Sequence, residues 1–268
     1  MVTRAPPNLR AMVPSVMGIL NVTPDSFSDG GRYLDPDAAV AHGLAMVAEG
    51  ASVIDVGGES TRPGAAPVDP AEERQRIVPV LAALVAEGVR CSIDTRHASV
   101  AEAAIEAGAT LVNDVSASLW EVAASAGVGW VALHMQGDPR TMQVEPHYDD
   151  VVGEVRAFLV ERAEQAVAAG VPEVWIDPGI GFGKRLEHNL TLLRRLGELT
   201  GTGHPVLVGT SRKGFLGTLT GGAPAHDRLE GSLATAVLAA ANGARMVRAH
   251  DVRHTVHAMR IVGEEIAA

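Results

Sequence analysis

The sequence contains a single cysteine, which excludes a disulfide framework. Proteins without disulfides are typical of reducing compartments, so we expect this protein to be cytoplasmic. The one thiol, Cys91, lies in the apolar segment 89–93, where nothing in the neighbouring sequence indicates a reactive thiol. We therefore predict that Cys91 fills space in a buried strand and is not a nucleophile.

Basic residues are also scarce, since 22 lysines and arginines oppose 32 aspartates and glutamates and give a formal net charge of -10. The sequence has no basic block and no aromatic-rich basic strip of the kind that nucleic-acid binders carry. Residues 1–10 lack the apolar core of a signal peptide, and no apolar run is long enough to span a membrane. We expect a small-molecule ligand, with no nucleic-acid or membrane partner.

Zinc-binding motifs are missing too, because the sequence has no Cys-x-x-Cys, no His-Glu-x-x-His and no cluster of histidines. A magnesium ion held mainly by substrate phosphates needs only one or two protein oxygens, so it would leave little trace in the sequence. Asn21, at the end of an apolar run, is the oxygen ligand that we nominate.

What the sequence does contain is a repeated alternation of short apolar runs and amphipathic segments. The runs predicted to be strands are 16–20, 52–56, 89–93, 111–112, 130–133, 174–176, 206–208 and 246–247. The helices predicted from three-to-four spacing include 38–49, 72–87, 98–107, 151–169 and 229–242, several of which stop at a glycine. Eight strand–helix units predict an α/β fold of the (β/α)8 TIM-barrel class.

We expect residues 12–268 to form this single barrel domain and residues 1–11 to be a flexible N-terminal extension. The alternative is an open, doubly wound sheet, which would gather ligand residues only at its switch points. Each apolar run closes on a polar residue, and in a barrel all eight ends face one rim. Two long polar segments, 21–31 and 59–64, are predicted to be loops over this rim, although either could be an ordinary surface connection.

The segment 177–184 is the most informative of the strand ends. An apolar run stops at Asp177 and opens into a loop with three glycines, whose spacing fits neither the dinucleotide fingerprint nor the Walker loop. An ionised carboxylate beside a core strand needs a partner, and no basic residue precedes Lys184 in this loop. We therefore predict that Asp177 faces a ligand; capping a turn through backbone amides is the alternative.

Cations gather at the other strand ends, namely at Arg62, Arg212, Lys213, Arg248 and His250. In a net-negative protein this set predicts an anion site, and the loops after the last two strands often bind phosphate in barrels. The carboxylates and the amide of Asp94, Asn113 and Asp177 instead suit a flat heterocycle with amino and amide-like groups.

The sequence resembles the dihydropteroate synthase family of pterin-binding TIM barrels over nearly the whole chain. The segments that carry the resemblance are 21–31, 58–64, 92–95, 113–116, 134–137, 177–184, 211–213 and 248–251. The resemblance implies a magnesium-assisted, dissociative condensation of 6-hydroxymethyl-7,8-dihydropterin diphosphate with 4-aminobenzoate, which yields 7,8-dihydropteroate and diphosphate in folate biosynthesis. It also implies sulfonamide binding in the aminobenzoate site and a homodimer.

The resemblance further implies a role for each matching residue. Pterin would be bound by Asp94, Asn113, Asp177 and Lys213, diphosphate by Asn21, Thr61, Arg248 and His250, and aminobenzoate by Phe27, Arg62, Pro63, Phe182 and Ser211. The catalytic residues would be Lys213, Asp94, Asp177 and Arg248, and Asn21 would hold magnesium.

Departures from the family pattern are small: Ala117 replaces a common glycine, and Ala249 replaces a usual valine. Two other functions remain open. One is a methyltransferase that acts on methyltetrahydrofolate and a corrinoid, and the other is a non-catalytic barrel that binds pterins.

Overall fold

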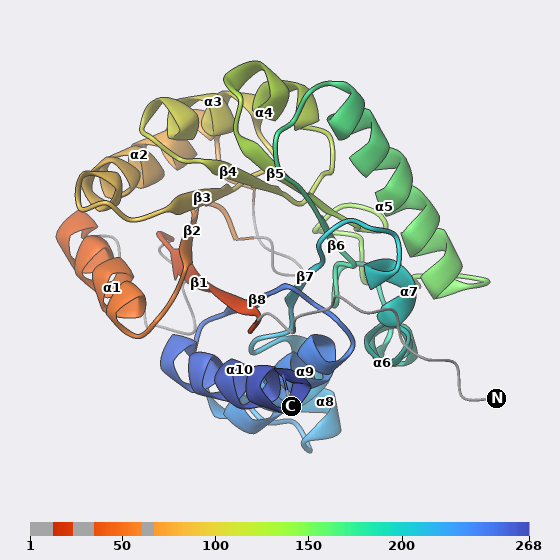
Figure 1. Cartoon of the computed structure of the whole chain (residues 1–268). Coiled ribbons are helices and arrows are strands. Elements are labelled where there is room, and N and C mark those ends of the chain that lie inside the picture. Colours follow the sequence, from red (N-terminus) through yellow and green to blue (C-terminus); the bar gives the residue numbers. More distant parts are fainter. Residues whose placement is uncertain (1–12, 24–34, 61–66, 268) are drawn as a thin grey trace.

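The computed structural model describes residues 13–23, 35–60 and 67–267 (Figure 1). The predicted N-terminal extension lies outside these residues. The strands are β1 (Ser15–Asn21), β2 (Val53–Gly57), β3 (Cys91–Asp94), β4 (Leu111–Asp114), β5 (Gly129–Leu133), β6 (Val174–Asp177), β7 (Leu207–Gly209) and β8 (Met246–Ala249).

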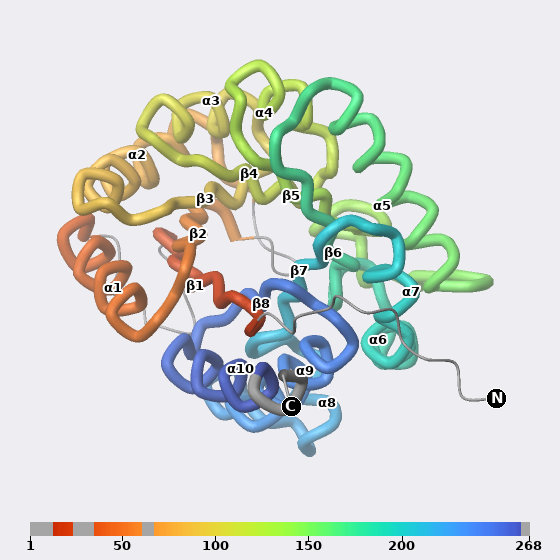
Figure 2. The backbone as a smooth tube through the Cα atoms, in the orientation of Figure 1, coloured from red at the N-terminus to blue at the C-terminus, as the bar shows by residue number. Residues whose placement is uncertain are grey.

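All the strand pairs are parallel, in the order β6-β5-β4-β3-β2-β1-β8-β7. An isolated parallel bridge between Ile176 and Val206 joins β6 to the start of β7 and closes the ring. Figures 1 and 2 show the strands inside a ring of helices. The predicted (β/α)8 barrel is therefore confirmed, and the open-sheet alternative is wrong because neighbouring strands follow the chain order all the way round.

The helices are α1 (Pro36–Ala48), α2 (Pro70–Ala86), α3 (Ala98–Glu106), α4 (Trp120–Ala126), α5 (Val151–Ala168), α6 (Leu186–Arg194), α7 (Gly197–Thr200), α8 (Gly214–Leu219), α9 (Leu229–Ala241) and α10 (Val252–Ala267), with a 3-10 turn at Ala225–Asp227. Helices α1 and α2 start earlier than predicted, because a proline, Pro36 or Pro70, occupies the first helical position of each. The side chains of Asp35 and Asp69 accept hydrogen bonds from free backbone amides in the first turns of these two helices. None of the described helices is long and apolar enough to cross a membrane.

Successive side chains of a strand point to opposite faces of the sheet, so the buried residues of the strands divide between two cores. The larger core lies between the sheet and the helices and includes Cys91, which is fully buried as predicted. Burial raises the pKa of the Cys91 thiol to about 12, so this group stays protonated. The smaller core fills the barrel interior with Met17, Val53, Leu111, Val131, Leu207 and Met246.

The residue two positions beyond an interior apolar residue faces the same side of the sheet and lies closer to the carboxyl end of the strand. Val53 is thus followed by Asp55, Leu111 by Asn113, and Met246 by Arg248. The barrel interior therefore changes from an apolar floor to a polar layer within two residues. This layer is where the candidate site begins.

Candidate active site

The polar layer of the barrel consists of Asp55, Asp94, Asn113, Asp177 and Arg248, which come from five strands. Asp55 is fully buried, and Asn113 and Asp177 are nearly so. Strand register brings them together, because Asp94 pairs with Asn113 across β3 and β4. The structure therefore gathers the predicted Asp94, Asn113, Asp177 and Arg248 in one place.

One guanidinium serves two carboxylates in this layer. Arg248 Nε donates to Asp55 Oδ2 at 2.6 Å, and Arg248 Nη2 donates to Asp94 Oδ2 at 2.6 Å. The amide of Asn113 also donates to Asp55 Oδ2, at 2.9 Å. A buried charge is costly without a partner, and here two negative charges share one positive charge. The polar layer therefore retains negative character.

Three acceptor atoms of this layer have no hydrogen-bond partner within the described part of the chain: Asp55 Oδ1, Asp94 Oδ1 and Asn113 Oδ1. Buried polar atoms are normally hydrogen-bonded, so unpaired atoms at a strand's carboxyl end indicate a place for a ligand or water. All three are oxygens. The site therefore suits a flat ligand that presents several N–H donors.

Lys213 lies at the edge of the polar layer, where it is half-buried. Its Nζ donates to the carbonyl of Ile180 and lies 4.2 Å from the centroid of the Phe182 ring. Lys213 also attracts Asp177, although burial is the larger influence and raises the pKa of Asp177. Asp177 Oδ1 accepts from the Gly179 amide at 2.7 Å, so the turn-capping interaction is present, and the ligand-facing role of Asp177 stays a prediction.

The pKa values of Asp94 and Lys213 predict a bell-shaped pH dependence. Burial raises the pKa of Asp94 to about 7, while burial lowers the pKa of Lys213 to about 8. A ligand rich in N–H groups needs an ionised Asp94, so binding is lost as pH falls through about 7. Lys213 loses its positive charge as pH rises through about 8, which weakens binding on the alkaline side. We expect the affinity for such a ligand to peak between these values. Asp94→Asn should move the acid limb and leave the alkaline limb in place, and an unchanged acid limb in this variant would contradict the assignment.

A second group of predicted residues lies on the rim. Ser211 Oγ accepts from the His250 amide at 3.1 Å and is 3.0 Å from His250 Nδ1. Asn21 ends β1, and a Cβ placed on Gly57 would lie 3.7 Å from Asn21 Oδ1 and 3.6 Å from Asp94 Cβ. Asn21 and Asp94 therefore both lie next to Gly57. Four predicted residues, Phe27, Thr61, Arg62 and Pro63, lie outside the described residues.

Arg212 follows the end of β7, as predicted, and its charge is paired within the protein. Its guanidinium makes two hydrogen bonds to Asp251, at 3.1 and 2.6 Å, and its backbone φ is 58°. Its amide donates to Ser232 Oγ. Arg212 therefore ties the loop after β7 to the end of β8, while Lys213, the next residue, reaches the polar layer.

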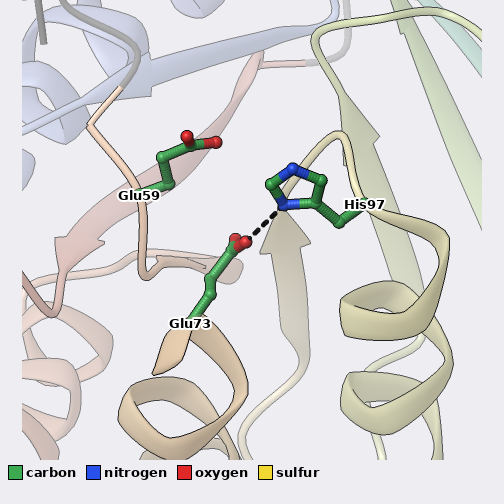
Figure 3. Close-up of side chains that lie close together, drawn as sticks. All are labelled: Glu59, Glu73 and His97. Carbon is green, nitrogen blue, oxygen red and sulfur yellow. Dashed lines mark hydrogen bonds and ion pairs between the residues drawn. The ribbon is translucent and has the colours of Figure 1, made fainter. Parts of the chain in front are cut away.

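A carboxylate and histidine cluster follows β2 and β3 (Figure 3). Arg96 donates to both oxygens of Glu59 at 3.0 Å, and the Val68 amide donates to Glu59 Oε1 at 3.2 Å. His97 Nδ1 lies 2.8 Å from Glu73 Oε2. Because Arg96 already neutralises Glu59, we assign this cluster to the ion pairs that join β2, β3 and α2.

Sequence reasoning missed Asp55. The available signal was an acid inside an otherwise apolar strand, the run 52–56, which the alternation of a barrel strand turns inward. Asp114, the neighbour of Asn113, accepts hydrogen bonds from the Ser118 and Leu119 amides and from Trp130 Nε1, and so shapes the turn after β4.

Several proteins resemble this chain over most of its length. The dihydropteroate synthase of Mycobacterium leprae is 53% identical over 265 residues, which cover 92% of each chain. That of Escherichia coli is 47% identical and covers 95% of this chain and 93% of its own. The Yersinia pestis dihydropteroate synthase, solved as a sulfonamide drug complex, superposes with a TM-score of 0.91 at 47% identity, over 95% of both chains. The Thermus thermophilus enzyme in complex with 4-aminobenzoate gives 0.86 at 46% identity, over 94% of both chains.

The fold and the site define a (β/α)8-barrel enzyme that receives its ligand at the carboxyl ends of the strands. The family model described as "Pterin binding enzyme" matches residues 17–250. The chain belongs to this family of pterin binding enzymes and, within it, to the dihydropteroate synthases. The family resemblance predicted from the sequence is thus confirmed.

Proposed function

We propose that this enzyme joins 6-hydroxymethyl-7,8-dihydropterin diphosphate to 4-aminobenzoate and releases diphosphate. The observation that carries the proposal is the set of three unpaired acceptor oxygens on Asp55, Asp94 and Asn113. A pterin presents amino and ring N–H donors along one edge, which matches these acceptors. Structures of a relative support the same substrates, because the Thermus thermophilus dihydropteroate synthase was solved in complex with 4-aminobenzoate and, separately, with 6HMPPP.

Asp177 and Lys213 complete the proposed pterin site. Asp177 is a carboxylate that would accept from the amino edge, and Lys213 Nζ would donate to the pterin carbonyl oxygen in place of its bond to the Ile180 carbonyl. The Phe182 ring beside Lys213 and the Ser211 hydroxyl on the rim would border the aminobenzoate. Phe27, Arg62 and Pro63 belong to the same proposed pocket, and Thr61, Arg248 and His250 to the proposed diphosphate site.

The reaction needs no protein nucleophile. The C–O bond to diphosphate breaks with its electron pair, the amine nitrogen forms the new C–N bond, and that nitrogen then loses a proton. Positive charge develops on the methylene carbon before the amine attacks, and the net-negative polar layer would stabilise it. The residues act by holding both substrates in position and by excluding water.

Magnesium fits the residues present, because Asn21 offers an oxygen beside Asp94 and hard cations prefer oxygen ligands. When bound with the diphosphate, the ion would neutralise charge on the leaving group. We expect Asn21→Ala to raise the magnesium concentration needed for half-maximal rate, with little change at saturating magnesium. The measurement is a magnesium titration of the rate of both proteins; an unchanged titration would remove Asn21 from the metal site.

The decisive experiment measures diphosphate release with and without 4-aminobenzoate, in the presence of magnesium. We expect release only when both organic substrates are present. A non-catalytic pterin-binding barrel would bind the pterin diphosphate and release no diphosphate, and a methyltetrahydrofolate methyltransferase would likewise release none with or without 4-aminobenzoate. Calorimetry that adds pterin diphosphate first and 4-aminobenzoate second would reveal whether binding is ordered.

We further propose that the enzyme works as a cytoplasmic homodimer and binds sulfonamides in the aminobenzoate site. The single buried cysteine suits a reducing compartment. The sulfonamide complex of the Yersinia pestis relative supports the inhibitor. Light scattering after gel filtration and competition of a sulfonamide with 4-aminobenzoate are the respective tests.

A further inference from the structure

Lys184 is a buried lysine that no step of the proposed reaction uses. It ends the glycine loop after β6, and only 3% of it is exposed. Its Nζ donates to the carbonyls of Phe182 at 2.9 Å and His134 at 3.2 Å, and it lies 2.9 Å from His134 Nδ1. A lysine ammonium has three donors, and three acceptors meet them here.

His134 is arranged to accept this contact. Burial, and then the nearby Lys184, lowers the pKa of His134 to about 3, so the imidazole stays neutral and Nδ1 is free of a proton when Lys184 donates to it. Burial lowers the pKa of Lys184 as well, although Asp177 opposes this effect. The Tyr148 ring lies 5.9 Å from Lys184 Nζ and covers the group.

The contacts of Lys184 join the loop after β6 to the loop after β5. The two backbones approach closely at two glycines. A Cβ on Gly179 would lie 1.9 Å from the carbonyl oxygen of His134, and a Cβ on Gly183 would lie 2.3 Å from the carbonyl oxygen of Gln136. Tyr148 adds a hydrogen bond to the Gly183 carbonyl at 2.8 Å. The glycines therefore permit the approach, and Lys184 supplies the buried hydrogen bonds that hold it.

The loop that Lys184 holds carries groups of the proposed active site. Its Gly179 amide binds Asp177, its Ile180 carbonyl accepts from Lys213, and the Phe182 ring lies beside Lys213 Nζ. Lys184 touches the backbone of Phe182 directly, whereas Asp177 is also fixed by its place in β6. Loss of Lys184 would therefore disturb Phe182 more than it disturbs the pterin carboxylates.

We propose that Lys184 is a positioning residue for the aminobenzoate side of the site, which it secures by fastening the Phe182 backbone to the His134 strand end. This inference rests on the proposed function. Methionine at position 184 would keep the length of the side chain and remove all three hydrogen bonds. We expect Lys184→Met to raise KM for 4-aminobenzoate about tenfold and to leave the Kd for pterin diphosphate nearly unchanged.

His134 offers a matched pair of variants that keep Lys184 itself. His134→Asn places an acceptor oxygen near the position of Nδ1 and should retain a KM close to that of the wild type, whereas His134→Leu removes this acceptor and should raise KM for 4-aminobenzoate. Hydrogen exchange of amides 179–183 provides a readout without turnover, and it should accelerate in Lys184→Met and His134→Leu but not in His134→Asn.

Three outcomes separate the possibilities. A wild type that releases no diphosphate would overturn the proposed function, and the exchange data would still report on the loop. If the wild type turns over while Lys184→Met and His134→Leu lower only thermal stability, the positioning role is wrong. An equal loss of affinity for both substrates would also refute it, because that result would mean general disruption of the site. If Lys184→Met does not fold, the two His134 variants decide between these outcomes.

Discussion

Replacing Arg248 with methionine is expected to lower the free energy of unfolding by about 3–5 kcal/mol at neutral pH, because it leaves buried carboxylates without their cation. Arg248 bonds Asp55 and Asp94 at 2.6 Å each, and within the described residues no other ion pair involves either of them. Methionine fills much of the same space, so the loss reports on charge more than on packing. Urea unfolding measures it.

The pH dependence of this loss tests its electrostatic origin. Burial already raises the pKa of Asp94 to about 7 with the guanidinium in place, and removal of Arg248 raises it further. A carboxyl group whose pKa is higher in the folded state than its unfolded value of about 3.9 destabilises the folded state at pH values above about 3.9. This destabilisation disappears as the pH falls toward about 3.9. Below about pH 7 Asp94 is protonated in both folded proteins and costs them the same, so the part of the difference that Asp94 contributes should grow as pH rises above about 7 and vanish below it.

Two further variants complete the test of Arg248. Arg253→Met changes an exposed arginine on α10 and should stay within about 0.5 kcal/mol of the wild type. Asp55→Asn in the Arg248→Met background removes one orphaned charge and should recover part of the loss. A stability difference that does not vary with pH would show that packing, and not charge, accounts for the effect.

The second large effect is expected for Lys213→Ala, which should lower kcat/KM for pterin diphosphate by about tenfold to a hundredfold, or roughly 1.5 to 3 kcal/mol. The variant loses the only lysine that reaches the polar layer, and with it the charged donor that we propose for the pterin carbonyl. Asp177→Asn should cost a similar amount. Steady-state kinetics in both substrates measures these losses.

A double variant tests whether the two groups act together. Lys213 and Asp177 attract each other, so the losses in the double variant should be smaller than their sum. The alkaline limb of the pH profile should disappear with Lys213→Ala and persist in Asp177→Asn. Wild-type kinetics in either single variant would contradict its assigned role.

The barrel could be predicted from the sequence because the signals were redundant. Each apolar run is followed by a polar residue, and most helices end at glycines such as Gly50 and Gly170, which both have positive φ. Local pattern and global topology therefore agree at every unit. The helix starts at Pro36 and Pro70 were predicted too late, because apolar periodicity begins after the proline that opens the first turn.

The pairing inside the site could not be predicted in the same way. Whether Asn113 or Asp114 faces inward depends on strand register, which a two-residue polar end leaves open. The resemblance implied a diphosphate ligand at Arg248, and the structure shows this residue bridging Asp55 and Asp94, which lie 193 and 154 residues away along the chain. Such contacts appear only once the ring of strands is closed.

The departure at Ala117 has a local physical meaning. This residue adopts φ of 48°, a left-handed conformation that costs an L-residue with a Cβ roughly 1–2 kcal/mol and glycine far less. A preference for glycine at this turn therefore follows from the backbone, and alanine is accommodated there as a buried residue of the outer core.

Lys184 and Lys213 are the only two lysines in the sequence. The first is enclosed, whereas the second is half-buried beside the ligand pocket, and burial lowers its pKa to about 8. A larger fraction of Lys213 is therefore an unprotonated amine at neutral pH than for an ordinary surface lysine. An electrophilic analogue that acylates amines would therefore meet Lys213 as the one lysine amine that is not enclosed, beside the proposed pterin site.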